Sequence, residues 1–369
     1  MKIIYISNSI IPSRTANSIQ VMKMCQAFAD NGHEVLLLYP SHIISESDIT
    51  NIYKYYGVRE CFQSLKLPCV KSKFGLYLYE ILAATKAKKR IPQLVYTRSL
   101  RSCFFCSLIG LNSIYEAHKI IHKKINLWFL SKTVKLKYFK HLIVISDALK
   151  QDFQCQYNIP SCKITTVHDA ADEPRQYEKL KLDQPNRFKV GYVGHLYSGK
   201  GMELIAELSI RCSWADFHII GGTNSDLDYW RVKLDHLNNI YFHGFIPPAE
   251  TEKYRQSCDV LIAPYQRRVS VFGGGGDVAR WMSPLKIFEY MASGKAIIAS
   301  DLPVLREVLI HEVTAILYKP EDIEAWVTGL INLRDNAKLR NYLGKRAREE
   351  FKKKYTWKAR ADKVLQSLT

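Results

Sequence analysis

The 369-residue sequence lacks any run of 18 or more uncharged apolar residues, the length that a membrane-spanning helix requires. Its first ten residues carry one Lys, no long apolar core and no small-residue cleavage site, so we expect no secretory signal peptide. The nine cysteines are odd in number and scattered, which is typical of reduced thiols rather than of a disulfide framework. These absences predict a cytoplasmic protein.

Metal-ligand patterns are also missing. Cys103 and Cys106 form a CxxC pair inside an apolar segment that has no second pair, and His118 and His122 have no third ligand nearby. Structural zinc sites need four ligands. We therefore expect the cysteines to lie on a packed helix face, and we expect neither a metal nor another resident cofactor.

Acidic residues are scarce in one part of the chain. The formal net charge is +18, and residues 61–140 contain sixteen Lys and Arg but only two acids, Glu80 and Glu116. A surface with charge of one sign favours an anionic partner, such as a membrane leaflet, a lipid-linked diphosphate or nucleic acid. No helix-turn-helix, zinc-finger or ribonucleoprotein signature is present, so we expect no nucleic-acid partner and keep nucleic-acid binding only as a rival function.

Apolar patterning predicts a parallel-sheet α/β fold. A strand at 2–7, a helix at 18–31 and a second strand at 33–40 form a βαβ unit. Strand-like runs follow at 94–97, 113–116 and 141–146. After the polar stretch 170–187 the alternation restarts, with strand-like runs at 188–194, 215–222, 239–244, 259–265 and 296–300.

This pattern favours two doubly wound, Rossmann-like domains over one long sheet. We expect domains at 1–175 and 186–340, followed by C-terminal helices at 341–369 that cross back to the N-terminal domain. Ligands of such folds bind beyond the carboxyl ends of the strands, which predicts a central cleft between the two domains.

The loop from Gly194 to Gly201 joins a buried-type strand to a helix. Its glycines let backbone N–H groups approach a phosphate, the helix N-terminus adds partial positive charge, and Lys200 adds a full charge. An ordinary strand-to-helix turn with a solvated Lys explains this loop about equally well.

A second anion site is predicted where Ser283 and Pro284 begin a helix. Ser is a preferred N-cap and Pro favours the first helical position. Lys286 lies in the first turn, where a cation opposes the helix dipole unless an anion is bound. Glu289 can accept both hydroxyls of a ribose. The competing interpretation is an amphipathic helix with a surface Glu.

His118 follows a strand end, from which it can reach a sugar hydroxyl or a leaving phosphate. A structural His is equally compatible with this position. Glycoside hydrolysis would need two cooperating carboxylates, which none of these motifs supplies.

The chain resembles glycosyltransferase family 4, a large family of retaining transferases with the two-domain GT-B fold. The resemblance rests on an ordered series of short stretches that covers nearly the whole chain: GHEV (32–35), YEAH (115–118), VIS (144–146), HDAAD (168–172), GYVGHLYSGKG (191–201), FHIIGG (217–222), FHGFIP (242–247), DVLIAPY (259–265), SPLKIFEYMASGKAIIASDLPVLREVL (283–309) and YTW (355–357).

The resemblance implies metal-independent transfer from a nucleoside diphosphate sugar. Lys200 matches the family's diphosphate-binding Lys, Glu289 its ribose-binding Glu, and His118 its His near the transferred sugar. Further donor-binding positions are implied at Thr15, Ala16, Gly194, Ile246, Ser283, Leu285 and Lys286.

Two positions depart from the family pattern. Trp281 stands where the family has a first Glu that contacts sugar hydroxyls, and Asp277 or Arg280 are candidates to replace it. His195 replaces the family's Arg partner of Lys200, and Lys286 can restore that charge.

We therefore expect a glycosyltransferase that acts on a hydroxyl acceptor, lipid-linked or free, in surface polysaccharide or glycolipid assembly. A nucleotide-sugar epimerase of the same fold is the alternative. Residues 117–140 predict a helix with Trp and Phe on one face and Lys123, Lys124, Lys132 and Lys135 facing an anionic membrane. Packing of that aromatic face into the domain core is nearly as well supported.

Overall fold

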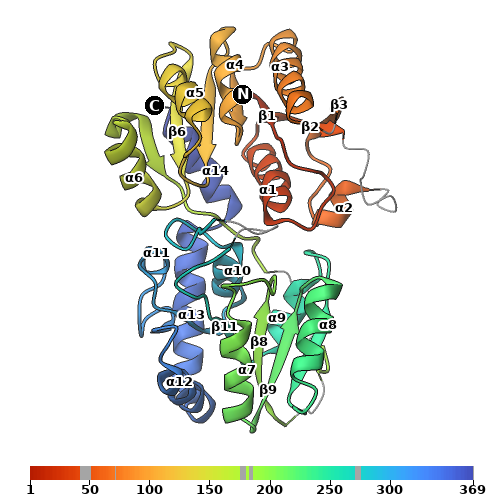
Figure 1. Cartoon of the computed structure of the whole chain (residues 1–369), viewed down its shortest axis with the longest axis vertical. Helices are drawn as coiled ribbons and strands as arrows, with labels where there is room; N and C mark the ends of the chain where they lie inside the picture. The colour runs from red at the N-terminus through yellow and green to blue at the C-terminus, as the bar shows by residue number, and fades with distance from the viewer. Residues whose placement is uncertain (42–50, 71, 175–179, 183–185, 271–275, 369) are drawn as a thin grey trace. The chain divides into compact units, whose positions relative to one another are not determined.

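The structure is a computed structural model that describes residues 1–41, 51–70, 72–174, 180–182, 186–270 and 276–368. The chain forms two compact units, Met1–Asp169 with Trp357–Thr369 and Ala170–Thr356. Each unit is built around its own parallel sheet, with helices on both faces (Figure 1). The predicted fold class, two Rossmann-like α/β domains, is confirmed.

The sheet of the N-terminal unit has seven parallel strands in the order β3-β2-β1-β4-β5-β6-β7. Its strands are β1 (Lys2–Ile6), β2 (Glu34–Ser41), β3 (Gln63–Pro68), β4 (Leu94–Thr97), β5 (Ser113–Ala117), β6 (Phe139–Val144) and β7 (Ile164–Thr166). Its helices are α1 (Ala16–Asp30), α2 (Ile52–Tyr56), α3 (Lys73–Lys89), α4 (Leu100–Leu108), α5 (Lys124–Thr133), α6 (Asp147–Tyr157), η1 (Ser161–Lys163) and α14 (Trp357–Gln366).

The central strands of this sheet are apolar on both faces because helices cover both sides. Ile3, Ile4 and Ile6 of β1 are fully buried. The last helix, α14, returns to this unit and packs beside α1, where Asn31 Nδ2 donates to Asp362 Oδ1 at 2.6 Å. Strands β2 and β3 lie on one side of β1, and β4 to β7 lie on its other side, so the strand order reverses between β1 and β4. The carboxyl ends of β1 and β4 therefore flank the switch point, where such folds bind ligands.

The sheet of the C-terminal unit has six parallel strands in the order β10-β9-β8-β11-β12-β13. Its strands are β8 (Phe188–Val193), β9 (Ala215–Ile220), β10 (Ile240–Gly244), β11 (Val260–Ala263), β12 (Ala296–Ser300) and β13 (Ile316–Tyr318). Its helices are α7 (Met202–Arg211), α8 (Asn224–Lys233), α9 (Thr251–Ser257), α10 (Leu285–Ser293), α11 (Pro303–Arg306), α12 (Ile323–Asp335) and α13 (Ala337–Lys354). The switch point of this sheet lies between β8 and β11, so the Gly194–Gly201 loop begins there.

The prediction of one long helix over residues 117–140 is wrong. Only α5, ten residues long, is helical, and β6 begins at Phe139. The apolar residues counted as one face serve two purposes, because Phe129 and Leu130 pack inward while Ile125 and Trp128 stay exposed. Within the described part of the chain, no helix is long and apolar enough to span a membrane.

Candidate functional site

The loop after β8 packs closely against Lys286 and Pro264. Gly194 has φ +152°, its N–H donates to the Ile220 carbonyl at 2.8 Å, and a Cβ atom there would lie 2.6 Å from Lys286 Nζ. Gly201 has φ +89° at the start of α7, and a Cβ atom there would lie 1.9 Å from the Pro264 carbonyl oxygen. Only Gly tolerates these conformations and approaches. The loop glycines therefore bring backbone close to a lysine ammonium.

Two lysine side chains gather at this switch point. Lys286 Nζ lies 3.7 Å from the ring centroid of Tyr192, and Lys286 Nζ and Lys200 Nζ lie 5.2 and 5.0 Å from that of Tyr265. Lys200 Nζ also lies 5.0 Å from the ring centroid of Tyr197. Aromatic faces attract cations, but they do not accept their hydrogen bonds as strongly as oxygen does. Lys286 Nζ is buried without a hydrogen-bond partner among the described residues.

The electrostatics of this cluster favour an incoming anion. Burial lowers the pKa of Lys200 to about 8. Burial, and then the charge of Lys200, hold the pKa of Lys286 well below its ordinary value. The pKa of His195 is lowered by burial and by both lysines. His195 is therefore uncharged at neutral pH and offers a hydrogen bond rather than a positive charge. A bound phosphate would reverse these shifts in the two lysines.

Helix α10 begins one residue later than predicted. Pro284, with ψ 123°, is the N-cap, so Leu285 is the first helical residue and Ser283 precedes the cap. The extended backbone of Pro284 is the reason, because a first helical residue needs helical ψ. The side chain of the N-cap residue accepts no hydrogen bond from the backbone N–H groups of the first turn. An uncapped helix N-terminus is a position at which anions bind.

Glu289 lies on α10 one turn after Lys286. Arg255 Nη1 donates to Glu289 Oε2 at 3.2 Å, and Arg255 Nε donates to Glu252 Oε2 at 2.9 Å. Arg255 is buried, whereas the Glu289 side chain is 29% exposed. Arg255 therefore fixes the direction of the Glu289 carboxylate while leaving part of it accessible. Ile246, the position implied for the base, is half-buried against the cluster that contains α10.

The two candidates to replace the missing carboxylate at Trp281 differ in their surroundings. Asp277 Oδ1 accepts from the N–H groups of Val269 and Ala279, each at 2.9 Å, so this carboxylate holds its own loop in place. Arg280 is exposed. Residues 271–275, which include most of the glycine run, lie outside the described residues. The structure gives neither candidate a contact that identifies it as the replacement.

His118 belongs to a buried polar network in the N-terminal unit. Its Nε2 atom contacts Glu116 Oε1 at the end of β5, and Gln20 Nε2 donates to the same oxygen at 2.6 Å. The other carboxylate oxygen, Oε2, lies 3.1 Å from Arg360 Nη2 of α14. Arg360 Nη2 also lies 3.4 Å from Asp169 Oδ1. One buried guanidinium therefore compensates two buried carboxylates.

This network fixes the charge and the tautomer of His118. Burial acts to raise the pKa of Glu116, but Arg360 and then His118 outweigh it and hold that pKa at about 2. Burial and the nearby charge of Arg98 lower the pKa of His118 in spite of Glu116. An ionised carboxylate only accepts hydrogen bonds, so Nε2 carries the proton of a neutral ring. Nδ1 of His118 is then left as an acceptor.

The remaining predicted residues of the N-terminal unit lie at the carboxyl end of β1. Thr15 is the N-cap of α1, where its side chain accepts from the Ser18 N–H, and Ala16 is the first helical residue. The structure thus places Thr15, Ala16 and His118 in one unit and the other predicted donor residues in the other. It brings together Gly194, His195, Lys200 and Lys286, with Glu289 on the same helix as Lys286.

Several residues of these clusters were not predicted from the sequence. They are Tyr192, Tyr265 and Arg255 in the C-terminal unit and Gln20, Arg98 and Arg360 in the N-terminal unit. Tyr192 and Tyr265 lie inside the matched stretches GYVG and DVLIAPY, which was a usable signal. Arg360 follows the YTW stretch closely, but nothing in the sequence links it to Glu116.

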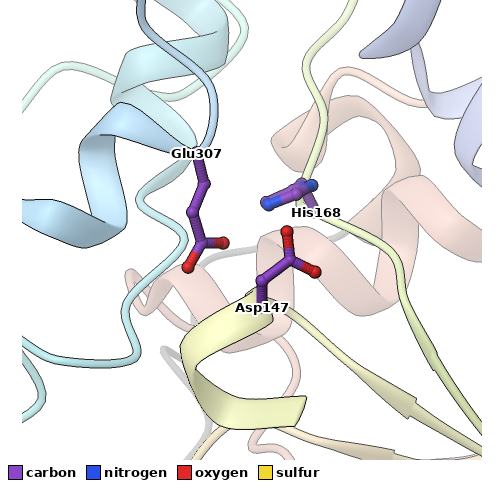
Figure 2. A group of neighbouring side chains, drawn as sticks. All are labelled: Asp147, His168 and Glu307. Atoms are coloured by element: carbon purple, nitrogen blue, oxygen red, sulfur yellow. The ribbon is translucent and has the colours of Figure 1, made fainter. Parts of the chain in front are cut away.

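Asp147 and His168, drawn in Figure 2, lie close together in the N-terminal unit, with ligand atoms within 4.8 Å of each other. Asp147 begins α6 and His168 follows β7. Glu307, the third side chain in the figure, belongs to the C-terminal unit. A carboxylate and an imidazole alone are fewer protein ligands than zinc sites use. The pair therefore gives no argument for a metal centre within this unit.

Comparison with known protein families identifies the family of this chain. The model described as "Glycosyl transferases group 1" matches residues 175–350, and the model "Glycosyltransferase Family 4" matches residues 18–175. The chain belongs to these glycosyltransferases. Members of this family are enzymes that transfer glycosyl groups, so the predicted family and enzyme class are confirmed.

Individual relatives are distant. The uncharacterized glycosyltransferase MJ1069 of Methanocaldococcus jannaschii is 28% identical over 63% of this chain and 59% of its own length. MJ1607 of the same organism is 22% identical over 92% of this chain and 90% of its own length. Bacillus subtilis TuaH, named as a candidate teichuronic acid biosynthesis glycosyltransferase, is 22% identical over 55% of this chain and 56% of its own length.

Solved structures share the fold at low identity. A glycosyltransferase of Rickettsia africae has a TM-score of 0.76 at 14% identity, covering 99% of this chain and 97% of its own. Anabaena Alr3699/HepE in complex with UDP has a TM-score of 0.72 at 14% identity, covering 100% and 99%.

Removal of the Lys286 charge is expected to stabilise the free protein. Lys286→Met should raise the free energy of unfolding, because the variant no longer buries a charged group. At pH values below the lowered pKa of the folded state, Lys286 is charged and its burial destabilises the protein by the full amount. This destabilisation vanishes as the pH rises toward 10.5, the ordinary pKa of a lysine. The gain should therefore be largest at pH values below the lowered pKa of Lys286 and disappear above about pH 10.5. Urea unfolding at several pH values measures this.

The control is Lys338→Met, the same substitution at an exposed position of α13. It should leave stability almost unchanged. A loss of stability in Lys286→Met would show that the ammonium has a partner that compensates it.

Arg360→Met is expected to destabilise the N-terminal unit by about 3–5 kcal/mol, because it removes the guanidinium that pairs with two buried carboxylates, Glu116 and Asp169. Adding Glu116→Gln and Asp169→Asn should recover part of that loss. The depressed pKa of Glu116 contributes stability that is present above its ordinary value of 4.5 and is lost as the pH falls toward 2. Urea unfolding between pH 3 and 7 measures both effects.

Lys358→Met on the exposed side of α14 serves as the control and should change little. If the triple variant were no more stable than Arg360→Met alone, the loss would come from packing of the Arg stem rather than from charge.

Proposed function

We propose that this protein transfers a sugar from a nucleoside diphosphate sugar to a hydroxyl acceptor, with retention of the anomeric configuration and without a metal. The observation that carries the proposal is the buried Lys286 ammonium, which has no hydrogen-bond partner in the part of the chain that the structure describes and lies beside Lys200 and Gly194. A diphosphate supplies the negative charge that this cluster lacks.

In this proposal the C-terminal unit binds the donor. Lys200 and Lys286 neutralise the diphosphate, the backbone N–H groups of Ser283 and Leu285 donate hydrogen bonds to it, and Gly194, which has no side chain, leaves room for it beside Lys286. These charges act most strongly on the negative charge that develops when the diphosphate departs, so they lower the barrier to transfer. His195 contributes a neutral hydrogen bond, consistent with its lowered pKa. The fold shared with HepE, which was solved with UDP, supports this choice of ligand.

Glu289 accepts the ribose hydroxyls, with Arg255 holding its second oxygen. The base lies against the backbone at Ile246. In the N-terminal unit, the loop at Thr15 and Ala16 approaches the phosphates, and Nδ1 of His118 accepts a hydrogen bond from a hydroxyl of the transferred sugar. An acceptor for sugar hydroxyls must be uncharged or anionic, which agrees with the lowered pKa of His118.

Attack of the acceptor hydroxyl on the face that the diphosphate leaves retains the configuration. The departing phosphate oxygen can receive the proton of that hydroxyl, so no protein carboxylate is required as base. The acceptor is a lipid-linked or free glycan of a surface polysaccharide or glycolipid, and the enzyme works at the cytoplasmic side of a membrane. The relationship to TuaH supports a role in surface polysaccharide assembly.

Donor turnover tests the proposal directly. The enzyme, stripped with a chelator, is incubated with UDP-, GDP-, ADP- and dTDP-sugars, and release of the nucleoside diphosphate is followed with and without acceptor. One donor should be consumed, and Lys200→Ala should lower kcat by about 10²–10³, the loss typical of one charge-stabilising group.

Lys345→Ala, at an exposed position of α13, is the matched control and should keep full turnover. Unchanged turnover in a folded Lys200→Ala variant would contradict the role of Lys200. Interconversion of the donor sugar without release of the diphosphate would indicate an epimerase instead.

Glu289→Gln should weaken binding of the nucleoside diphosphate by about tenfold, because one ribose hydrogen bond to a charged acceptor is worth about 1.5 kcal/mol. Binding and turnover should fall together, since a ribose contact exists in both the ground state and the transition state. Calorimetric titration with UDP, or with the diphosphate of the preferred donor, measures the affinity.

Glu252→Gln removes the charge of the other carboxylate that Arg255 contacts. This control should leave nucleotide affinity nearly unchanged. Equal losses in the two variants would mean that Glu289 acts only through Arg255.

A further inference from the structure

The outer surface of helices α3, α4 and α5 combines exposed apolar side chains with basic ones. Phe74, Leu78 and Ile81 of α3 are 72%, 49% and 42% exposed, and their spacing places them in one stripe along the helix. Ile125 and Trp128 of α5 are 52% and 48% exposed. Isolated exposed apolar residues need no explanation, but a grouped set marks an interaction surface.

Ring contacts join these helices into one continuous face. Phe104 of α4 lies 5.8 Å from Trp128 and 5.1 Å from Phe129, and Tyr77 of α3 lies 6.4 Å from Phe129, measured between ring centroids. Helix α4 packs between α3 and α5, as Figure 1 also shows. Tyr77 and Phe104 remain partly exposed between the two stripes. We call this surface, made by α3, α4 and α5, the three-helix face.

The three-helix face belongs to residues 61–140, and the exposed charged side chains described in this segment are all basic. Glu80 and Glu116, the two acids of residues 61–140, are 0% and 1% exposed and are used internally by Arg101 and Arg360. The exposed cations of the segment are Lys66, Lys86, Lys88, Lys89, Arg90, Lys119, Lys123, Lys124, Lys132, Lys135, Lys137 and Lys140. Lys132 Nζ lies 6.0 Å from the ring of Trp128, so charge and aromatic surface are adjacent.

We infer that the three-helix face docks on an anionic lipid bilayer, with Phe74, Leu78 and Trp128 entering the headgroup region and the surrounding lysines contacting lipid phosphates. Exposed Trp and Phe beside Lys are suited to this boundary, because the rings enter the apolar side and the ammonium groups stay at the headgroups. The inference builds on the proposed function, since a lipid-linked acceptor is presented at such a surface.

Two other occupants fit this face less well. A second copy of the chain would place one basic surface against another, and like charges opposed across an interface are repulsive. Nucleic acid would match the lysines, but aliphatic side chains such as Leu78 and Ile81 gain nothing from a phosphate backbone. An anionic bilayer matches both the charge and the apolar stripe.

Vesicle sedimentation of the full chain, without donor, tests the inference. The protein should bind vesicles of equimolar phosphatidylcholine and phosphatidylglycerol, should not bind vesicles of phosphatidylcholine alone, and should release as salt is raised. Phe74→Gln with Leu78→Gln should weaken binding by at least about tenfold, because two apolar side chains no longer leave water. Tyr229→Gln with Val232→Gln, on exposed positions of α8, is the matched control and should bind as the unmodified protein does.

A second pair of variants tests the charge. Replacing Lys123, Lys124, Lys132 and Lys135 by Gln should lower binding by roughly fivefold for each lysine near the surface. Replacing Lys338, Lys345, Lys352 and Lys353 of α13 by Gln changes the net charge equally and should leave binding nearly unchanged. Brominated lipid should quench Trp fluorescence of the unmodified protein, and should quench it less in Trp128→Phe.

Equal binding to neutral and anionic vesicles, or equal losses in the two lysine variants, would overturn the inference. Binding that survives in Phe74→Gln with Leu78→Gln would reduce the face to a non-specific charged surface. Tighter binding of a duplex DNA of random sequence would assign the face to nucleic acid, and a dimer abolished by the same apolar variant would assign it to a second copy. Donor turnover measured without vesicles should be unchanged in every variant, so failure here is separable from failure of the proposed function.

Discussion

A buried ammonium group, to which the described residues offer no hydrogen-bond partner, is the constraint on which the C-terminal unit depends. Burying a cation is costly unless an opposite charge or a strong acceptor accompanies it. Among the described residues, Lys286 Nζ lies against the faces of Tyr192 and Tyr265, and burial and the charge of Lys200 lower its pKa more than Glu289 raises it. Gly194 is required because its φ of +152° is strained for any other residue, and a Cβ atom there would also lie 2.6 Å from the ammonium. The loop, the tyrosines and α10 therefore hold positive charge at the point where the sheet topology predicts a ligand, which is the basis of the proposed anion site.

The N-terminal unit handles buried charge in the opposite way. Arg360 lies between Glu116 and Asp169, so its cost is compensated within the protein before any ligand arrives. This network keeps His118 neutral and fixes its tautomer. One unit thus carries uncompensated charge suited to binding, and the other carries compensated charge suited to orienting a ring. Because α14 supplies Arg360, the tautomer of His118 depends on a helix that follows the whole C-terminal unit in the chain.

Local patterns in the sequence predicted those parts of the structure that depend on neighbouring residues. Each predicted strand is present within two residues at either end, because buried parallel strands are short apolar runs bounded by Gly and polar residues. Lys286 was identified because a cation in a first helical turn is unfavourable without an anion. The contacts between these residues could not be predicted, since Tyr192 meets Lys286, Arg255 meets Glu289 and Arg360 meets Glu116 only through tertiary packing. The helix expected at 117–140 was wrong because apolar residues of α5 and β6 were counted as one period.

The same physical reasoning connects the interior and the surface of this protein. In residues 61–140 the two carboxylates are buried against Arg101 and Arg360, so none remains to neutralise the outer lysines. A basic surface repels itself, and that repulsion costs stability unless an anionic partner relieves it. In the two proposals, the lysines beside Trp128 therefore stand in the same relation to a lipid headgroup as Lys286 does to a diphosphate. At both places positive charge is held next to aromatic rings, which bind a cation weakly and leave its stronger interactions to a phosphate.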